Sequence, residues 1–283
     1  METTPNQAQI ELWSGRVGEK WAALQSRMDA MLSEVTAGLK ARAGPVGGLR
    51  LLDIGCGSGV TCALWLEGGA EVTGVDVSTP MLAVAEQRTQ GKARLIEADA
   101  SVWRDDRPFD LVVSQFGVMF FDDPEAAFTN IAKNIRPGGR LLFACWRAAG
   151  ENPWATQPLA AVRELLGTAP PPPPEGPPPP GPFAFADKAR IETVLSGAGF
   201  AEIAVSPFDF QVRLAAEGGV EAAVDLVLQI GPASAALAEA GDAGEAARAA
   251  APARLAAVLA PHARDGAVTM DGAVWMVEAV RPG

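Results

Sequence analysis

The sequence contains no tyrosine and only one histidine, His262, among its 283 residues. A histidine-based catalytic triad or a metal site with several histidine ligands is therefore nearly excluded. The three cysteines, Cys56, Cys62 and Cys145, lie in apolar stretches, lack the spacing of metal ligands and do not form an even set. We expect neither a metal site nor a disulfide framework, and the reducing cytoplasm is the expected location.

Long apolar runs and excess positive charge are missing as well. No stretch of about 20 apolar residues is available to cross a bilayer, and no apolar run follows a basic N-terminus as in a secretion signal. The net charge of −11 disfavours binding to a nucleic-acid backbone or to an anionic membrane. The sequence therefore predicts a soluble intracellular protein without membrane insertion, and it leaves a homodimer open.

The stretch LLDIGCGSG, residues 51–59, organises the rest of the chain. Its apolar residues indicate a strand buried on both faces, its three alternating glycines indicate a turn, and residues 60–67 follow as a helix. Glycines in such a turn let a ligand approach the backbone, and the helix N-terminus offers unpaired N–H groups. Val60 stands where a dinucleotide-binding turn would place its third glycine. A tight turn without any ligand is the plainest alternative.

Strands and helices alternate from residue 49 to residue 146. We expect strands at 49–54, 71–77, 93–97, 109–117 and 140–146, with helices at 60–67, 79–90 and 123–134 between them. Arg136–Gly139 reads as a turn before the last of these strands, and Asp122 and Asp123 as helix-capping residues. Repeated units of this kind predict a doubly wound parallel sheet with helices on both faces and a ligand site at the carboxyl ends of its strands.

Four segments follow from composition and pattern. Residues 1–48 form an amphipathic helical segment, and residues 49–168 form the core. Residues 169–182 are a proline-rich connection, for which an extended surface path is favoured over a partner-docking motif. Residues 183–283 complete the sheet, with an Ala-rich helical insertion at about 215–262 before a closing strand at 272–280.

Together these pieces resemble the class I S-adenosylmethionine-dependent methyltransferases. LLDIGCGSG looks like the first motif of that family, VTGVDVS like its second strand with the terminal acid, EADA like its third strand and IRPGGRLLFACW like its fifth. The run FGVMFFDDP, with Asn152-Pro153-Trp154, is similar to the small-molecule branch that includes ubiquinone- and menaquinone-biosynthesis methyltransferases. The resemblance implies a Rossmann-like α/β fold with a seven-stranded, mostly parallel sheet, an N-terminal helical lid and a helical insertion before the last strand.

The resemblance also implies a set of residues that bind S-adenosylmethionine. They are Asp53, Gly55, Gly57, Asp76, Val77, Met81, Asp99, Ala100 and Ser114. Asp53 would face the ammonium group, and Asp76 would accept hydrogen bonds from the ribose hydroxyls. Asp99 would accept from the adenine amino group, although capping of a helix before Val102 is its alternative role.

Five aromatic residues are candidates for an acceptor pocket: Trp13, Trp21, Phe116, Trp146 and Trp154. They predict a small, apolar or aromatic acceptor, and the alternative for several of them is core packing. The catalytic residues stay unknown, because Gln115 and the two capping acids are the polar groups near the fourth strand and His262 lies far along the chain. Methyl transfer from a sulfonium disperses charge, so alignment and exclusion of water suffice without a metal.

Two other functions remain open. An NAD(P)-dependent oxidoreductase shares the doubly wound fold, but Val60 and the Arg-Pro-Gly-Gly turn disfavour it. A non-catalytic subunit that binds the cofactor and associates with a partner would keep the same glycine turn.

Overall fold

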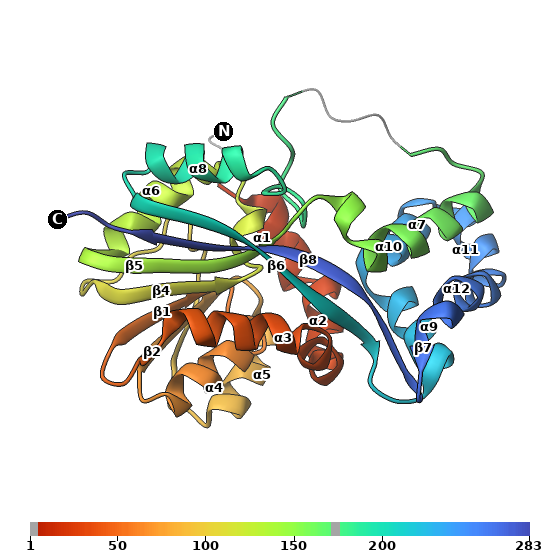
Figure 1. The fold of residues 1–283 in the computed structure, drawn as a ribbon, viewed down its shortest axis with the longest axis horizontal. Coiled ribbons are helices and arrows are strands. Elements are labelled where there is room, and N and C mark those ends of the chain that lie inside the picture. The colour runs from red at the N-terminus through yellow and green to blue at the C-terminus, as the bar shows by residue number, and fades with distance from the viewer. Residues whose placement is uncertain (1–4, 171–175) are drawn as a thin grey trace.

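The computed structural model describes residues 5–170 and 176–283, which form an α/β fold (Figure 1). The strands are β1 (Arg50–Ile54), β2 (Glu71–Asp76), β3 (Arg94–Glu97), β4 (Phe109–Gln115), β5 (Ile135–Trp146), β6 (Ala201–Ala215), β7 (Ala263–Arg264) and β8 (Ala267–Val280). Their order in the sheet is β3-β2-β1-β4-β5-β8-β6, with β7 paired to β8 outside that path. The strands β1 to β5 are parallel, and β8 is antiparallel to both of its neighbours. The expected seven-stranded, mostly parallel sheet is confirmed.

Helices cover both faces of this sheet (Figure 1). The helices of the described residues are α1 (Gln7–Ser14), α2 (Arg16–Ala23), α3 (Gln25–Ala43), α4 (Val60–Glu67), α5 (Thr79–Thr89), α6 (Pro124–Asn134), α7 (Pro153–Leu166), α8 (Lys188–Gly197), α9 (Gly219–Gln229), α10 (Gly231–Glu239), α11 (Gly241–Arg248) and α12 (Ala251–Leu259). The helices α3, α4 and α5 lie on one face, and α6 and α8 lie on the other (Figure 1). Central strands between two helical layers bury both faces, which explains the continuous apolar runs of β1 and β4.

The N-terminal segment bends twice before it reaches the sheet. The chain breaks at Gly15 between α1 and α2, and at Leu24 between α2 and α3. The longest of the three helices, α3, buries Met28, Met31, Val35 and Leu39 at helical spacing and packs on β6 and β5. The expected amphipathic pattern is therefore a core face for α3. In contrast, α1 contacts the loop after β2 through Ser14, and α2 packs on α5.

The helical insertion lies between two long strands in the chain, β6 and β8. β6 and β8 are paired from Ala201–Val280 to Ala215–Val268 and extend beyond the rest of the sheet (Figure 1). The helices α9 to α12 follow β6 and pack with α7 into a separate body of helices. We expected shorter strands at 203–210 and 272–280. The alternation of exposed Gln211 and Arg213 with buried Val212 and Leu214 is the period-two signal that extends β6.

The expected turn at Arg136–Gly139 lies inside a strand. β5 begins at Ile135, which pairs with Phe109, and the register shifts before Arg140 pairs with Leu111. Gly138 has φ +72 in this irregular stretch, and its N–H donates to the carbonyl of Arg281 at 2.8 Å. The glycine pattern correctly indicated a departure from regular extended backbone. The boundary of the strand was wrong, because pairing continues on both sides of the bulge.

Part of the proline-rich connection, residues 171–175, lies outside the described residues. Gly176 to Pro180 form neither helix nor strand. Within residues 5–170 and 176–283, no single helix is long and apolar enough to span a membrane, while the bent pair of α9 and α10 meets that test by length and composition.

Candidate active site

The glycine turn between β1 and α4 requires glycine at each of its three positions. Gly55, Gly57 and Gly59 have φ values of +64, +53 and +77, in the left-handed region. A Cβ atom on Gly55 would lie 2.7 Å from the Cα of Gly117, which follows β4. The turn is thus pressed against the end of β4. A ligand at the carboxyl ends of these strands would meet bare backbone.

Asp76 ends β2 and is bonded to the glycine turn. One carboxylate oxygen accepts from the Gly57 N–H at 2.8 Å, and the other accepts from the Ser78 N–H at 2.8 Å. Burial raises the pKa of Asp76, and the backbone hydrogen bonds oppose that rise. A carboxylate has about four lone-pair sites, so two acceptor sites remain for a ligand. The side chain fits the predicted role of binding two ribose hydroxyls.

Asp53 is fully buried beneath the same turn. One oxygen accepts from the Cys62 Sγ at 3.5 Å, and the other has no hydrogen-bond partner. Burial raises the pKa of Asp53 to about 7. An unpartnered buried carboxylate oxygen is unfavourable unless a water or a ligand cation satisfies it. This feature fits the predicted contact with an ammonium group, directly or through water.

Asp53→Asn should remove the loss of folding stability that the wild type shows as the pH rises. The folded pKa lies near 7, above the ordinary value of 3.8. Between these values the folded protein binds more protons than the unfolded chain, so it loses stability as the pH rises through that window. Asparagine does not ionise. The variant should therefore gain stability over the wild type across this window, reaching roughly 2–4 kcal/mol. Urea unfolding at about pH 5 and about pH 8 checks this, and an equal difference at both would contradict it.

Val77 and Met81 lie next to these acids. Val77 is half-buried, and its carbonyl accepts from the Ser14 hydroxyl at 2.8 Å. Met81 is buried in the first turns of α5, and its terminal methyl would lie 2.7 Å from a Cβ added to Gly57. The predicted adenine neighbours and the glycine turn are thus brought together.

Asp99 is bound to the N-terminal segment. Its oxygens accept from the Asn6 Nδ2 at 2.9 and 3.0 Å, from the Ser101 N–H at 2.9 Å and from the Ser101 hydroxyl at 2.7 Å. The neighbouring residue Ala100 is buried, and its carbonyl accepts from the Asn130 Nδ2 at 3.1 Å. Sequence reasoning missed Asn6, because a single Asn ahead of a helix gives no signal beyond capping.

The Ser114 hydroxyl makes both of its hydrogen bonds to the protein backbone. It is fully buried, its hydroxyl donates to the carbonyl of Ile54 at 2.8 Å, and it accepts from the Gly117 N–H at 3.1 Å. The residue therefore fastens the end of β4 to the end of β1. The neighbouring side chain of Gln115 accepts from the Thr36 hydroxyl of α3 at 2.8 Å.

The five predicted acceptor residues form two separate aromatic groups. Trp13 contacts Trp21 and Phe120 edge to face, with ring centroids 5.4 and 5.3 Å apart. Phe116 stacks on Trp146 at 4.6 Å, and Trp154 lies 4.9 Å from Trp146. Trp146 is 5% exposed, so it backs the other two rings from the core. The first group joins the N-terminal segment to the turn after β4, and the second joins the ends of β4 and β5 to the start of α7.

Asn152 fixes one end of the second group. It is fully buried, its Oδ1 accepts from the Trp154 indole N–H at 3.2 Å and from the Ala273 N–H at 2.9 Å, and its Nδ2 donates to the Ala273 carbonyl at 3.1 Å. Trp154 also lines a small apolar cavity of about 10 Å³ with Met31 and Leu226. That volume is the space of about one water, so this cavity does not hold an acceptor.

The two acids after β4 differ in what they do. Asp123 caps α6 by accepting from the Ala126 N–H at 3.0 Å, as predicted. Asp122 instead accepts from the Asn6 N–H at 2.9 Å, so the prediction of capping was wrong for this residue. In the described parts of the chain, His, Cys, Asp and Glu side chains form no group of three that could hold a metal ion.

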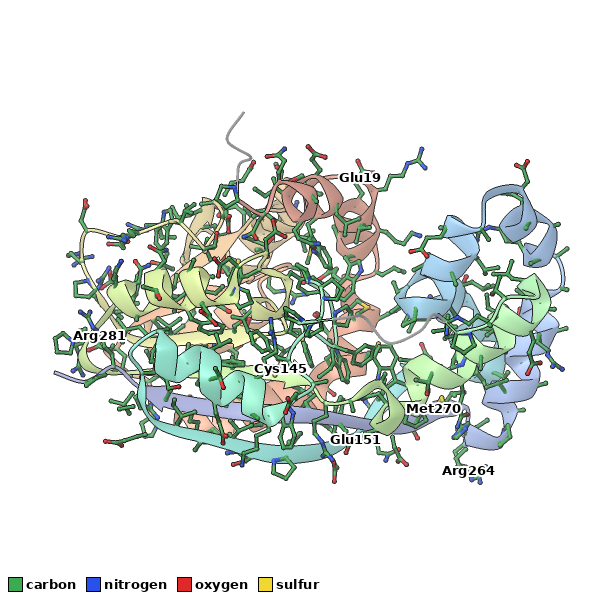
Figure 2. The ribbon with its side chains drawn as sticks, turned by 90° about the horizontal axis from the view of Figure 1, so that it is seen from above. Glu19, Cys145, Glu151, Arg264, Met270 and Arg281 are labelled. Carbon is green, nitrogen blue, oxygen red and sulfur yellow. The ribbon has the colours of Figure 1, made fainter. Side chains whose placement is uncertain are left out.

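His262→Gln should leave turnover unchanged within about twofold. His262 lies in a short 3-10 turn, Ala260–His262, after the helical insertion. Arg264, two residues further on, lies at the end of the molecule opposite Arg281, away from Cys145 in β5 (Figure 2). Rates measured from about pH 6 to about pH 9 span the usual titration of histidine. A loss of roughly a hundredfold at unchanged cofactor affinity would make His262 a general base instead.

Comparisons with known proteins match the segment that contains the glycine turn. Residues 52–143 match the family described as methyltransferase domain. Malonyl-[acyl-carrier protein] O-methyltransferase of Enterobacter lignolyticus is 35% identical over 133 residues, which cover 42% of this chain and 52% of that protein. Ubiquinone biosynthesis O-methyltransferase of Maricaulis maris is 33% identical over 105 residues, covering 35% and 41%. The chain thus spans about half, or less, of the length of these curated relatives.

A solved structure shares the fold. Phosphoethanolamine N-methyltransferase 2 of Haemonchus contortus, in complex with phosphomonomethylethanolamine and S-adenosylhomocysteine, is similar with a TM-score of 0.50 at 19% identity. The similarity covers 88% of this chain and 53% of that one. The matched segment 52–143 includes the glycine turn, the acid that ends β2 and the whole of β4. Residues 52–143 are therefore similar to a methyltransferase domain, and the chain shares the α/β fold of the solved methyltransferase.

Proposed function

We propose that this protein transfers a methyl group from S-adenosylmethionine to a small, apolar or aromatic acceptor, by in-line displacement and without a metal. One observation carries the proposal. A left-handed glycine turn, an acid with free acceptor sites and a buried, unpartnered carboxylate oxygen meet at the carboxyl ends of β1 and β2. A cofactor that combines a flexible amino acid with a ribose needs these features together.

The residues present fit the cofactor. Asp53 provides an unsatisfied oxygen for the ammonium group, and Asp76 provides acceptors for the two ribose hydroxyls. Val77 and Met81 provide an apolar surface for the adenine, for which methionine is well suited because its sulfur is polarizable. The Asp99 carboxylate provides an acceptor for the amino group of that ring. When bound, the cofactor supplies an electrophilic methyl group on a sulfonium.

The protein's own part in the reaction is alignment and exclusion of water. Phe116 follows β4 and Trp154 lies at the start of α7, and both rings are partly buried and pack against Trp146 at the end of β5. Trp13 of α1 contacts both Trp21 of α2 and Phe120 after β4. A wall of this kind suits a flat, apolar acceptor and keeps water from the reacting centre. We assign no general base, because an activated carbon or a phenolate needs little help to attack a sulfonium.

The proposal also covers the class of acceptor, the cellular location and the oligomeric state. The acceptor is a small molecule and not a nucleic acid, since a net charge of −11 repels phosphate backbones. The three cysteines are free and buried, which fits the cytoplasm. A homodimer is proposed without a defined interface.

Ligand-induced stabilisation distinguishes a protein that binds S-adenosylmethionine from one that binds a nicotinamide cofactor. S-adenosylmethionine and S-adenosylhomocysteine should raise the melting temperature of the wild-type protein, while NAD and NADP should not. Stabilisation by a nicotinamide cofactor alone would favour the oxidoreductase. Binding of S-adenosylmethionine without formation of S-adenosylhomocysteine, across a panel of phenols, quinols and activated ring compounds, would favour the non-catalytic subunit.

A further inference from the structure

Asn6 bonds the N-terminal segment to two carboxylates in the loops after β3 and β4, those of Asp99 and Asp122. Its Nδ2 bonds to both oxygens of Asp99 and to the Ser101 hydroxyl at 3.0 Å. Its own N–H donates to Asp122 at 2.9 Å, and its Oδ1 accepts from the Asp122 N–H at 2.7 Å. The residue is 5% exposed and has φ +55, a left-handed conformation that asparagine tolerates better than most residues. Every polar group of this residue that is described is engaged.

The same segment contacts the turn after β2. The Ser14 hydroxyl donates to the carbonyl of Val77 at 2.8 Å. A Cβ atom on Gly18 would lie 2.3 Å from the Ser78 Oγ, so α2 approaches that turn as closely as a glycine permits. Residues 6–18 therefore connect the loops that follow β2, β3 and β4. These loops surround the carboxyl ends of the strands, where ligands bind in such sheets.

The Asp99 carboxylate accepts two contacts on each oxygen while Asn6 is bound. Ser101 supplies two hydrogens, one from its N–H and one from its hydroxyl. Asn6 supplies one hydrogen, shared between the two oxygens, because the other hydrogen of its amide is directed to Ser101. Because this hydrogen is shared, a further donor on one oxygen would leave Asn6 bonded to the other. Asn6 and Ser101 together fix the orientation of the carboxylate.

We propose that Asn6 is a positioning residue of the cofactor site: it orients the Asp99 carboxylate and holds residues 6–18 closed over the cofactor. This inference rests on the proposed function, in which Asp99 accepts from the adenine amino group. Two consequences follow. Loss of the Asn6 amide should speed the release of the cofactor, because the segment that covers it is no longer fastened. It should also weaken selection for the adenine amino group, because the carboxylate is no longer held.

Two substitutions test the Asn6 side-chain amide while keeping the backbone conformation of the segment. Asn6→Gly keeps the left-handed backbone without strain and removes the side chain. Asn6→Asp has nearly the same shape but places a third carboxylate beside Asp99 and Asp122. Repulsion then replaces the two contacts of the amide with the Asp99 oxygens. Gln7→Ala is the matched control, because Gln7 is exposed and bonds within α1 to Glu11 at 2.7 Å.

The experiment measures release of S-adenosylhomocysteine by stopped-flow competition and its Kd by calorimetry. Release should be roughly tenfold faster or more in Asn6→Gly, and faster still in Asn6→Asp. The control should match the wild type. S-inosyl-L-homocysteine, which carries an oxo group in place of the adenine amino group, is the second probe. The wild type should prefer the amino ligand by roughly tenfold or more, and this preference should shrink in both Asn6 variants.

Each outcome decides a different question. Failure of the wild type to bind S-adenosylhomocysteine overturns the proposed function and this inference with it. Normal binding by the wild type, with release rates and preference in both Asn6 variants equal to Gln7→Ala, overturns this inference alone. Loss of fold in both Asn6 variants, measured by circular dichroism, also contradicts it, because Asn6 would then be a structural residue. Faster release with an unchanged preference contradicts the orientation of Asp99.

Discussion

S-adenosylhomocysteine should bind Gly57→Val about 100-fold more weakly than the wild type, a loss of about 2.7 kcal/mol. Gly57 has φ +53, a conformation that a β-branched residue adopts only with strain. A Cβ atom at this position would lie 2.7 Å from the terminal methyl of Met81 and would displace that flexible side chain. The new methyl groups would also fill the space in which the cofactor is proposed to lie. Calorimetric titration measures the change.

The matched control for this variant is Gly150→Ala. Gly150 has nothing within 4 Å of an added Cβ and no left-handed φ. That protein should bind the cofactor as the wild type does. If Gly57→Val keeps wild-type affinity, the glycine turn does not contact the cofactor and the site is misplaced. A lowered melting temperature alone does not explain weak binding, provided the variant is folded at the temperature of the titration.

Deletion of residues 1–22 should lower turnover by roughly a hundredfold or more and leave a folded protein. The deletion removes α1 and nearly all of α2, including Trp13 and Trp21, but it ends before α3. The buried face of α3 packs on β5 and β6, so the core keeps its own contacts. Turnover should collapse because the acceptor loses alignment and water reaches the reacting centre.

This deletion is judged by two measurements together. Circular dichroism and the melting temperature report the fold, and methyl transfer to an acceptor that supports wild-type turnover reports the reaction. A folded protein with normal turnover would remove Trp13 and Trp21 from the acceptor site. A protein that no longer folds would make the segment part of the core.

The fold, the glycine turn and the acid that ends β2 could be predicted because their sequence signals are local. The order strand, glycines, helix in residues 51–67 determines the turn, since the left-handed φ values require glycine. Asp76 ends an apolar strand, where a carboxylate has few roles other than binding. Asp123 followed by Pro124 predicts a helix start, and its side chain accepts from the third residue beyond it. Each of these inferences needs only a few neighbouring residues.

The remaining features depend on contacts between distant parts of the chain. Asn6 and Asp122 are 116 positions apart, and Ser114 bonds to the carbonyl of Ile54, 60 positions earlier. Sequence pattern records the residue types but not these pairings. The same reason explains why the sequence indicated five candidate acceptor residues but not which of these rings contact one another. The start of β5 was misplaced because a bulge and a turn have the same glycine signal.

The most direct test of the central claim is a calorimetric titration of wild type and Asp76→Ala with S-adenosylhomocysteine. Asp76→Asn serves as the near-isosteric second variant, since the carboxylate also accepts from the N–H groups of Gly57 and Ser78. The wild type should bind, and Asp76→Ala should bind more weakly by roughly 1.5–3 kcal/mol, the scale for hydrogen bonds to charged groups. Equal affinity of wild type and both folded variants, or binding of NAD in place of S-adenosylhomocysteine, would contradict the account.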